Sequence, residues 1–129
     1  MRIYIAGPYT GKSEDKHQIP KEVQRNVDHA IEIFHKLKDD GHQPYVPHLS
    51  HYLHLHPSGM DSGDTWYYEY DLTFIEHWAE AIFMLEGWKG SYGSVLELER
   101  AKELNLKVFL EEKRETVKEI EDIIKKEGN

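Results

Sequence analysis

The stretch AGPYTGKS (residues 6–13) ends in Gly-Lys-Ser directly after a short apolar run, as a phosphate-binding P-loop does. A P-loop leads straight into a helix whose first amides hold the phosphate. Here Ser13 is followed by the polar run EDKHQIP, apolar residues at helical spacing begin only near Pro20, and Pro8 lacks an amide hydrogen. These features argue against a nucleoside triphosphate site. They favour a surface loop, with Lys12 and Ser13 as candidates for contact with a single phosphate.

Two carboxylates are better placed for chemistry. Asp71 precedes the apolar run AIFML (81–85), and Glu97 follows the glycine-rich turn EGWKGSYG, in the expected first turn of a helix. One carboxyl group can stabilise or capture a cationic centre while a second, with a raised pKa, protonates a leaving group. At a helix N-terminus Glu97 is expected to stay ionised. The alternative for Glu97 is a capping box, in which it bonds back to the amide of Ser94.

Tyr9 and a group of histidines follow the first two predicted strands. Tyr9 is a candidate to orient Glu97 through its hydroxyl. Four histidines lie within nine residues, namely His48, His51, His54 and His56. Imidazoles at such spacings can bind zinc or nickel, but no cysteine and no His-x-x-x-His helix is recognised with them. We expect an irregular solvated loop, with His48 as a ligand contact, and neither a metal nor a cofactor.

The pattern of apolar residues predicts the elements that position these side chains. Strands are expected at 2–6, 43–47, 81–85 and 107–110, and helices from Pro20 to before Gly41, from about Thr65 to Trp78, over roughly 94–104 and within the charged segment 111–129. This alternation predicts an α/β, three-layer, flavodoxin-like or Rossmann-like fold, a small parallel sheet flanked by helices, in a single domain (1–129). Ligands of such folds bind beyond the carboxyl ends of the strands, where the loops 7–19, 48–64 and 86–94 are expected to converge.

Composition excludes several classes of function. The net charge is −8, which argues against binding a nucleic acid polymer. No apolar run approaches the ~20 residues that span a bilayer, and no leader peptide is recognised. The absence of cysteine suits a reducing compartment, so we expect a cytoplasmic protein without contact to a membrane.

The segments IYIAGPY, YDL and GSYGSVLELERA resemble the nucleoside 2-deoxyribosyltransferase superfamily, which includes the 2'-deoxynucleoside 5'-phosphate N-hydrolases. The Gly-x-x-x-Glu-Leu-x-x-Ala pattern of that family matches Gly93 to Ala101, and the resemblance covers about residues 2–110. It implies that Glu97 is the nucleophile and that Asp71 assists departure of the base. Glu80 stands where the family often has an aspartate. The resemblance also implies a homo-oligomer.

The resulting hypothesis is an enzyme that cleaves the N-glycosidic bond of a (deoxy)nucleoside or its 5'-monophosphate, with transfer to another base or to water. Aromatic side chains of 66–70 or Trp88 are candidates to stack on the base. The expected substrate-binding residues are Gly7, Pro8, Lys12, Ser13, His48, Trp88, Ser91, Gly93 and Ser94. Two alternatives remain, a non-catalytic nucleotide-binding module of the same fold and a small interaction subunit that uses the aromatic run and the last helix.

Overall fold

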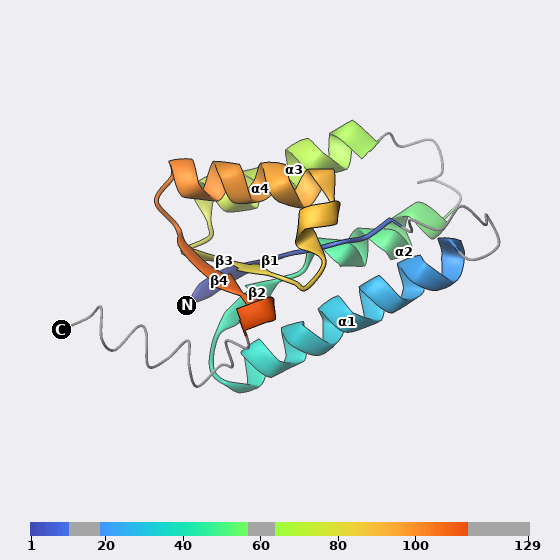
Figure 1. Cartoon of the computed structure of the whole chain (residues 1–129), viewed down its shortest axis with the longest axis horizontal. Helices are drawn as coiled ribbons and strands as arrows, with labels where there is room; N and C mark the ends of the chain where they lie inside the picture. Colours follow the sequence, from blue (N-terminus) through green and yellow to red (C-terminus); the bar gives the residue numbers. More distant parts are fainter. Residues whose placement is uncertain (11–18, 57–63, 114–129) are drawn as a thin grey trace.

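A computed structural model describes residues 1–10, 19–56 and 64–113 of the chain (Figure 1). Its four parallel strands form one sheet in the order β2-β1-β3-β4. The strands are β1 (Arg2–Ala6), β2 (Gln43–Tyr45), β3 (Ala81–Met84) and β4 (Lys107–Leu110), and the helices are α1 (Ile19–Asp39), α2 (Ser50–Leu55), α3 (Asp64–His77) and α4 (Tyr92–Glu103). The predicted α/β fold with a parallel sheet is confirmed.

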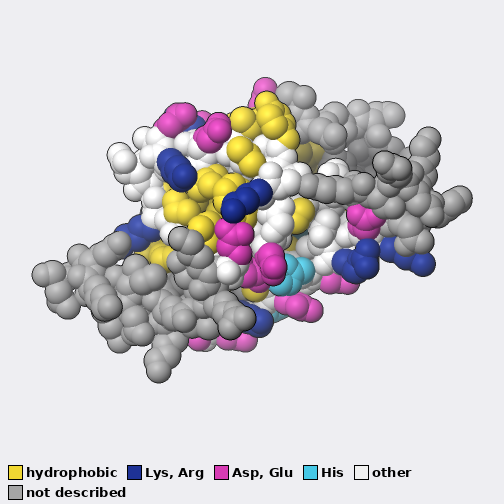
Figure 2. Space-filling view, viewed as in Figure 1, with side chains coloured by type: hydrophobic (Ala, Val, Ile, Leu, Met, Phe, Trp, Pro, Cys, Tyr) yellow, Lys and Arg dark blue, Asp and Glu magenta, His cyan; other side chains and the backbone are white. Residues whose placement is uncertain are grey.

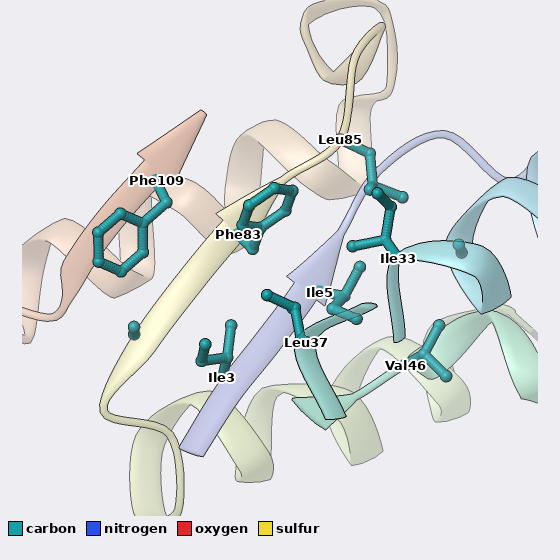
Figure 3. Close-up of a cluster of buried hydrophobic side chains, with 10 residues drawn as sticks. Ile3, Ile5, Ile33, Leu37, Val46, Phe83, Leu85 and Phe109 are labelled. Atoms are coloured by element: carbon teal, nitrogen blue, oxygen red, sulfur yellow. The ribbon is translucent and has the colours of Figure 1, made fainter. Parts of the chain in front are cut away.

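The sheet is the middle layer of three. Helix α1 covers one face, and α3 and α4 cover the other (Figure 1). Side chains of β1 alternate between the two faces, because successive residues of a strand point in opposite directions. Ile3 and Ile5 enter the core on the α1 side, together with Phe83, Ile33 and Leu37 (Figure 3).

The opposite face of β1 carries the residues that concern the site. Tyr4 and Ala6 are fully buried there, against Ile75 of α3 and Leu98 and Ala101 of α4. Strands buried on both faces explain why the apolar runs of this sequence are continuous rather than alternating. A tyrosine in such a run is therefore buried like its neighbours.

The second strand is shorter than the expected range of 43–47. β2 ends at Tyr45, and Val46, although extended, already precedes a 3-10 helix over Pro47–Leu49. Proline suits the first turn of a helix, since its φ is preset and its missing amide hydrogen costs nothing there. The 3-10 helix leads directly into α2 (Ser50–Leu55). The expectation of a wholly irregular loop from residue 48 is thus wrong.

The ends of the long helices agree more closely with the sequence. α1 begins at Ile19, one residue before the expected Pro20, and Gly41 follows it with a φ of 90°. α4 begins at Tyr92, two residues earlier than expected. Lys12, Ser13 and residues 114–129 of the charged C-terminal segment lie outside the described residues.

The lengths of the helices and the distribution of charged side chains are relevant to contact with a membrane or a nucleic acid. None of these helices is both long enough and apolar enough to cross a bilayer. On the face drawn in Figure 2, Lys and Arg side chains lie dispersed among acidic and apolar ones.

Candidate active site

A cavity of about 620 Å³ opens at the carboxyl ends of the strands. The strand order reverses between β1 and β3, so the chain leaves β1 toward one face of the sheet and leaves β3 toward the other. This divergence creates the crevice. The cavity is lined by Gly7, Tyr9, Thr10, Pro47, His48, Ser50, Tyr67, Tyr68, Asp71, Gly90, Ser91, Tyr92, Gly93, Ser94, Leu96 and Glu97. The described parts of the three loops expected to converge therefore meet at one cavity.

Glu97 lines this cavity from α4 and is 9% exposed. Its Oε2 accepts a hydrogen bond from the hydroxyl of Tyr4, which is fully buried on β1. Tyr4, which the sequence analysis did not single out, thus holds Glu97 in the way that we expected of Tyr9. The hydroxyl of Tyr9 lies 2.9 Å from Nδ1 of His51, while Tyr9 itself lines the cavity.

Ser91, rather than Ser94, caps α4. The Ser91 Oγ accepts from the Ser94 amide at 3.4 Å and from the Ser94 hydroxyl at 3.0 Å. The capping-box interpretation of Glu97 is therefore wrong, because the amide that Glu97 was to occupy already has Ser91 as its partner. Since the helix begins at Tyr92, Glu97 lies in its second turn, beyond the free amides of the first.

Burial controls the protonation of Glu97. Desolvation raises its pKa to about 8, and the neighbouring charge of Asp71 acts in the same direction, whereas the hydrogen bond from Tyr4 lowers it. The expectation that a helix N-terminus keeps Glu97 ionised is wrong for the empty cavity. Removal from water outweighs the helix dipole once the carboxyl lies a full turn from the helix start.

Asp71 lines the same cavity from α3 and is half-buried. Its Oδ1 accepts a hydrogen bond from the hydroxyl of Tyr45 at 3.0 Å. Burial raises the pKa of Asp71 to about 6, and the hydrogen bond from Tyr45 opposes that rise. The cavity thus holds two carboxyl groups from different helices, each bonded to a tyrosine of the sheet.

The two tyrosines are direct neighbours in the sheet. Tyr4 and Tyr45 are partners in the parallel register of β1 and β2, and their ring centroids lie 5.7 Å apart. Sequence reasoning assigned both to strands and gave neither a role. One signal was present, because a phenol in a buried strand needs a hydrogen-bond partner.

His48 connects two of the loops around the cavity. It is 4% exposed, and its Nε2 donates to the carbonyl oxygen of Pro8 at 3.1 Å. Burial lowers the pKa of His48 to about 4, so the imidazole is neutral. Within the described residues, no three His, Asp or Glu side chains lie close enough together to hold a metal ion.

Of the other predicted binding residues, the described ones divide into two groups. Gly7, Ser91, Gly93 and Ser94 line the cavity. Pro8 instead lines a second cavity, of about 320 Å³, together with Asn26, His29, Leu85 and Glu86.

Trp88 does not line the cavity either. It packs against the core between the sheet and the helices α3 and α4, and its indole nitrogen is buried there. From the aromatic run 66–70, Tyr67 and Tyr68 line the cavity, whereas Trp66 and Tyr70 are 58% and 45% exposed. The phenol rings that line the cavity therefore come from α3, from Tyr92 at the start of α4 and from Tyr9.

Comparison with known proteins places the chain in a family. A family model described as a domain of unknown function, DUF4406, matches residues 1–110. The chain belongs to this family. The DUF4406 chain is similar in structure to a 2-deoxyribosyltransferase from the psychrotolerant bacterium Bacillus psychrosaccharolyticus, with a TM-score of 0.56 and 23% identity over 85% of this chain and 71% of that one. This similarity shows a shared fold. The comparison with curated proteins gives no match.

Proposed function

We propose that this protein cleaves the N-glycosidic bond of a nucleoside or nucleoside 5'-monophosphate, with Glu97 as nucleophile and Asp71 as the acid. The observation that carries the proposal is the pair of carboxyl groups in one cavity, with Glu97 held by Tyr4 and Asp71 by Tyr45. A second support is the fold, which is shared with a protein named as a 2-deoxyribosyltransferase.

The two carboxyl groups divide the chemistry of the bond between them. The Glu97 carboxylate forms a bond to C1' while the bond from C1' to the base nitrogen breaks. The electron pair leaves with the base, which takes the proton of Asp71. Water or a second base then attacks C1' and displaces Glu97, and the proton released by this nucleophile returns to Asp71. Hydrolysis and transfer share the first step and differ only in the attacking group.

The cavity supplies the other requirements of this reaction. Tyr67, Tyr68 and Tyr9 present aromatic rings against which a base can stack. Thr10, Ser50 and the α4 N-terminus, where Ser91 and Ser94 lie, supply hydroxyl groups for a sugar or its substituent. The volume of about 620 Å³ lies within the usual range for small-molecule sites.

The pKa values require a proton to move before the first step. Glu97, with a pKa of about 8, holds a proton in the empty cavity at pH 7, and Asp71, with a pKa of about 6, is mostly ionised. The productive form has the reverse distribution and is therefore the minority form at pH 7. A ligand that brings a basic nitrogen toward Asp71 favours the productive form.

The test is incubation of the full chain with deoxynucleosides, ribonucleosides and their 5'-monophosphates, with free base measured by chromatography. Release of base from at least one class is expected, and adding a second base decides between transfer and hydrolysis. If every class binds and none releases base, the proposal fails.

That outcome belongs to the second candidate, a non-catalytic nucleotide-binding module of the same fold. It is favoured by the burial of Glu97, which is 9% exposed at the cavity. Burial raises the pKa of Glu97, and a neutral carboxylic acid can donate a hydrogen bond to a ligand. Nucleotide binding that is unchanged in Glu97→Gln, without release of base, supports this candidate. The third alternative, an interaction subunit, gives no reason for two carboxyl groups to converge on one cavity, as Asp71 and Glu97 do.

We further infer a single-domain, cytoplasmic homo-oligomer. Exposed apolar side chains of α2 and α3, including Leu53, Leu55 and Trp66, offer a surface for self-contact. Analytical ultracentrifugation measures the oligomeric state directly, and a monomer at all concentrations contradicts the inferred homo-oligomer.

A further inference from the structure

We infer that Tyr45 is a positioning residue for the proposed reaction, which holds Asp71 at the cavity and, through its pairing with Tyr4, fixes Asp71 relative to Glu97. This inference rests on the proposed function and adds a residue to it. The hydroxyl of Tyr45 donates to Asp71 at 3.0 Å, and the ring of Tyr45 lies beside that of Tyr4, which holds Glu97.

The ring of Tyr45 is held on two sides. On one side it stacks on Phe74, with 4.0 Å between the centroids and 14° between the planes. On another it lies 5.7 Å from Tyr4, and Trp78 approaches edge-on at 6.3 Å. A phenol whose ring is fixed in this way presents its hydroxyl in one direction. Asp71 therefore receives a hydrogen bond from a donor that is already oriented.

Helix α3 supplies both the carboxyl group and the ring that fixes its donor. Asp71 and Phe74 are three residues apart and thus lie on the same face of the helix. That face meets Tyr45, so one contact between α3 and β2 sets the ring stack and the hydrogen bond together.

The sheet register links this arrangement to Glu97. Tyr4 pairs with Tyr45 across β1 and β2, and both side chains reach the face covered by α3 and α4. A slip of the pairing by one residue would turn Tyr45 to the opposite face. The register of two strands therefore positions two catalytic carboxyl groups from two helices.

The titratable groups that face Asp71 come from three elements. They are Tyr45 on β2, Tyr4 on β1 and Glu97 on α4. Of these, the Tyr45 hydroxyl stabilises the ionised carboxylate and lowers the pKa of Asp71, in opposition to burial. Loss of this hydroxyl is therefore expected to raise that pKa while leaving the ring stack in place.

The experiment is a carbon-detected NMR titration of the Asp71 and Glu97 carboxyl groups in the full chain without substrate. Tyr45→Phe should raise the pKa of Asp71 by about one pH unit, a typical effect for one donor to a carboxylate. Phe74→Leu, which keeps the hydroxyl and removes the stacked ring, should shift it in the same direction by less. The matched control is Tyr70→Phe, which removes an exposed hydroxyl from the same helix and should shift neither group.

Activity is measured in parallel as base release per enzyme. Tyr45→Phe should move the acidic limb of the pH profile upward with the titrated pKa of Asp71. After division by the larger fraction of protonated Asp71, kcat should be about tenfold lower than in the wild type, with KM nearly unchanged. An unchanged pKa of Asp71 in folded Tyr45→Phe, or an equal shift in Tyr70→Phe, overturns the inference. Because the titration needs no turnover, an inactive wild-type protein would count against the proposed function alone.

Discussion

Glu97 combines deep burial with access to a cavity. Only 9% of the residue is exposed, and one carboxyl oxygen is bonded to Tyr4, so the carboxyl group has one fixed partner and little water. An attacking carboxylate benefits from this environment because it need not shed a hydration shell before it reacts. The same environment raises its pKa, so reactivity and protonation are linked in a single side chain.

Replacement of Glu97 by glutamine is expected to abolish turnover. The amide has nearly the same shape and still accepts from Tyr4, but it cannot form the bond to C1', so base release should fall by at least ~10³-fold. The control is Glu99→Gln, an exposed carboxyl two residues further along α4. Full activity in Glu97→Gln would exclude Glu97 as nucleophile.

The pH dependence of kcat/KM should follow both carboxyl groups. Activity should rise toward a pH of about 6, remain level, and fall above a pH of about 8, because the productive form needs Glu97 ionised and Asp71 protonated. In Asp71→Asn the alkaline fall should disappear, and the residual activity should rise with ionisation of Glu97 at a pH below 8, because the charge of Asp71 no longer raises the pKa of Glu97. A wild-type profile with a single limb near the ordinary pKa of a glutamate would show that Glu97 does not act in this way.

At the scale of the elements, close packing at the end of β1 explains one glycine. A Cβ added at Gly7 would lie 2.5 Å from Cβ of Leu85, which belongs to the chain just after β3. The two strand ends therefore approach more closely than side chains allow. Gly7 is therefore needed by this packing, besides its place in the lining of the cavity.

Gly7→Ala should therefore destabilise the protein by about 1–3 kcal/mol, the usual cost of overpacking. Gly93→Ala is the matched comparison, since a Cβ at Gly93 has no atom within 4 Å and alanine favours a helix. It should leave the free energy of unfolding unchanged or raise it. Urea denaturation of the two variants measures the difference, and equal stabilities would contradict the packing argument.

The sequence predicted most elements but only part of the site. The strands at β1, β3 and β4 and the three long helices followed from apolar periodicity, and from these the parallel sheet followed. α2 was missed because its six residues are too few for a periodic pattern. Tyr4 and Tyr45 were missed because their role depends on strand register and on helices far along the chain. Trp88 was misassigned, since its place in the loop did not reveal the core beneath it.

At the scale of the whole molecule, the two buried carboxyl groups of the site lower the free energy of unfolding as the pH rises. A carboxyl group with a raised pKa keeps its proton longer in the folded state than in the unfolded one. Stability contributed by that proton is complete below the unfolded pKa, near 4.5 for a glutamate, and is lost as the pH rises toward 8. Asp71 acts in the same direction between 3.8, the ordinary pKa of an aspartate, and about 6.

Glu97→Gln should therefore be more stable than the wild type at alkaline pH. The difference in the free energy of unfolding should grow by about 2 kcal/mol between pH 6 and pH 8, a window in which Asp71 contributes little change. Urea denaturation at several pH values measures this. A difference that does not depend on pH would mean that Glu97 has an ordinary pKa.

The short strand β2 is expected to open locally at temperatures below those that unfold the protein. It lies at the edge of the sheet, pairs with β1 alone over three residues, and contains Pro44, which donates no amide hydrogen. Edge segments of this kind open locally before a protein melts. Local opening of β2 would break the hydrogen bond from Tyr45 to Asp71, while Tyr4 stays in place on an inner strand. We therefore expect amide hydrogen exchange to be faster at Tyr45 than at Tyr4, and catalysis to fade on warming before the fold does.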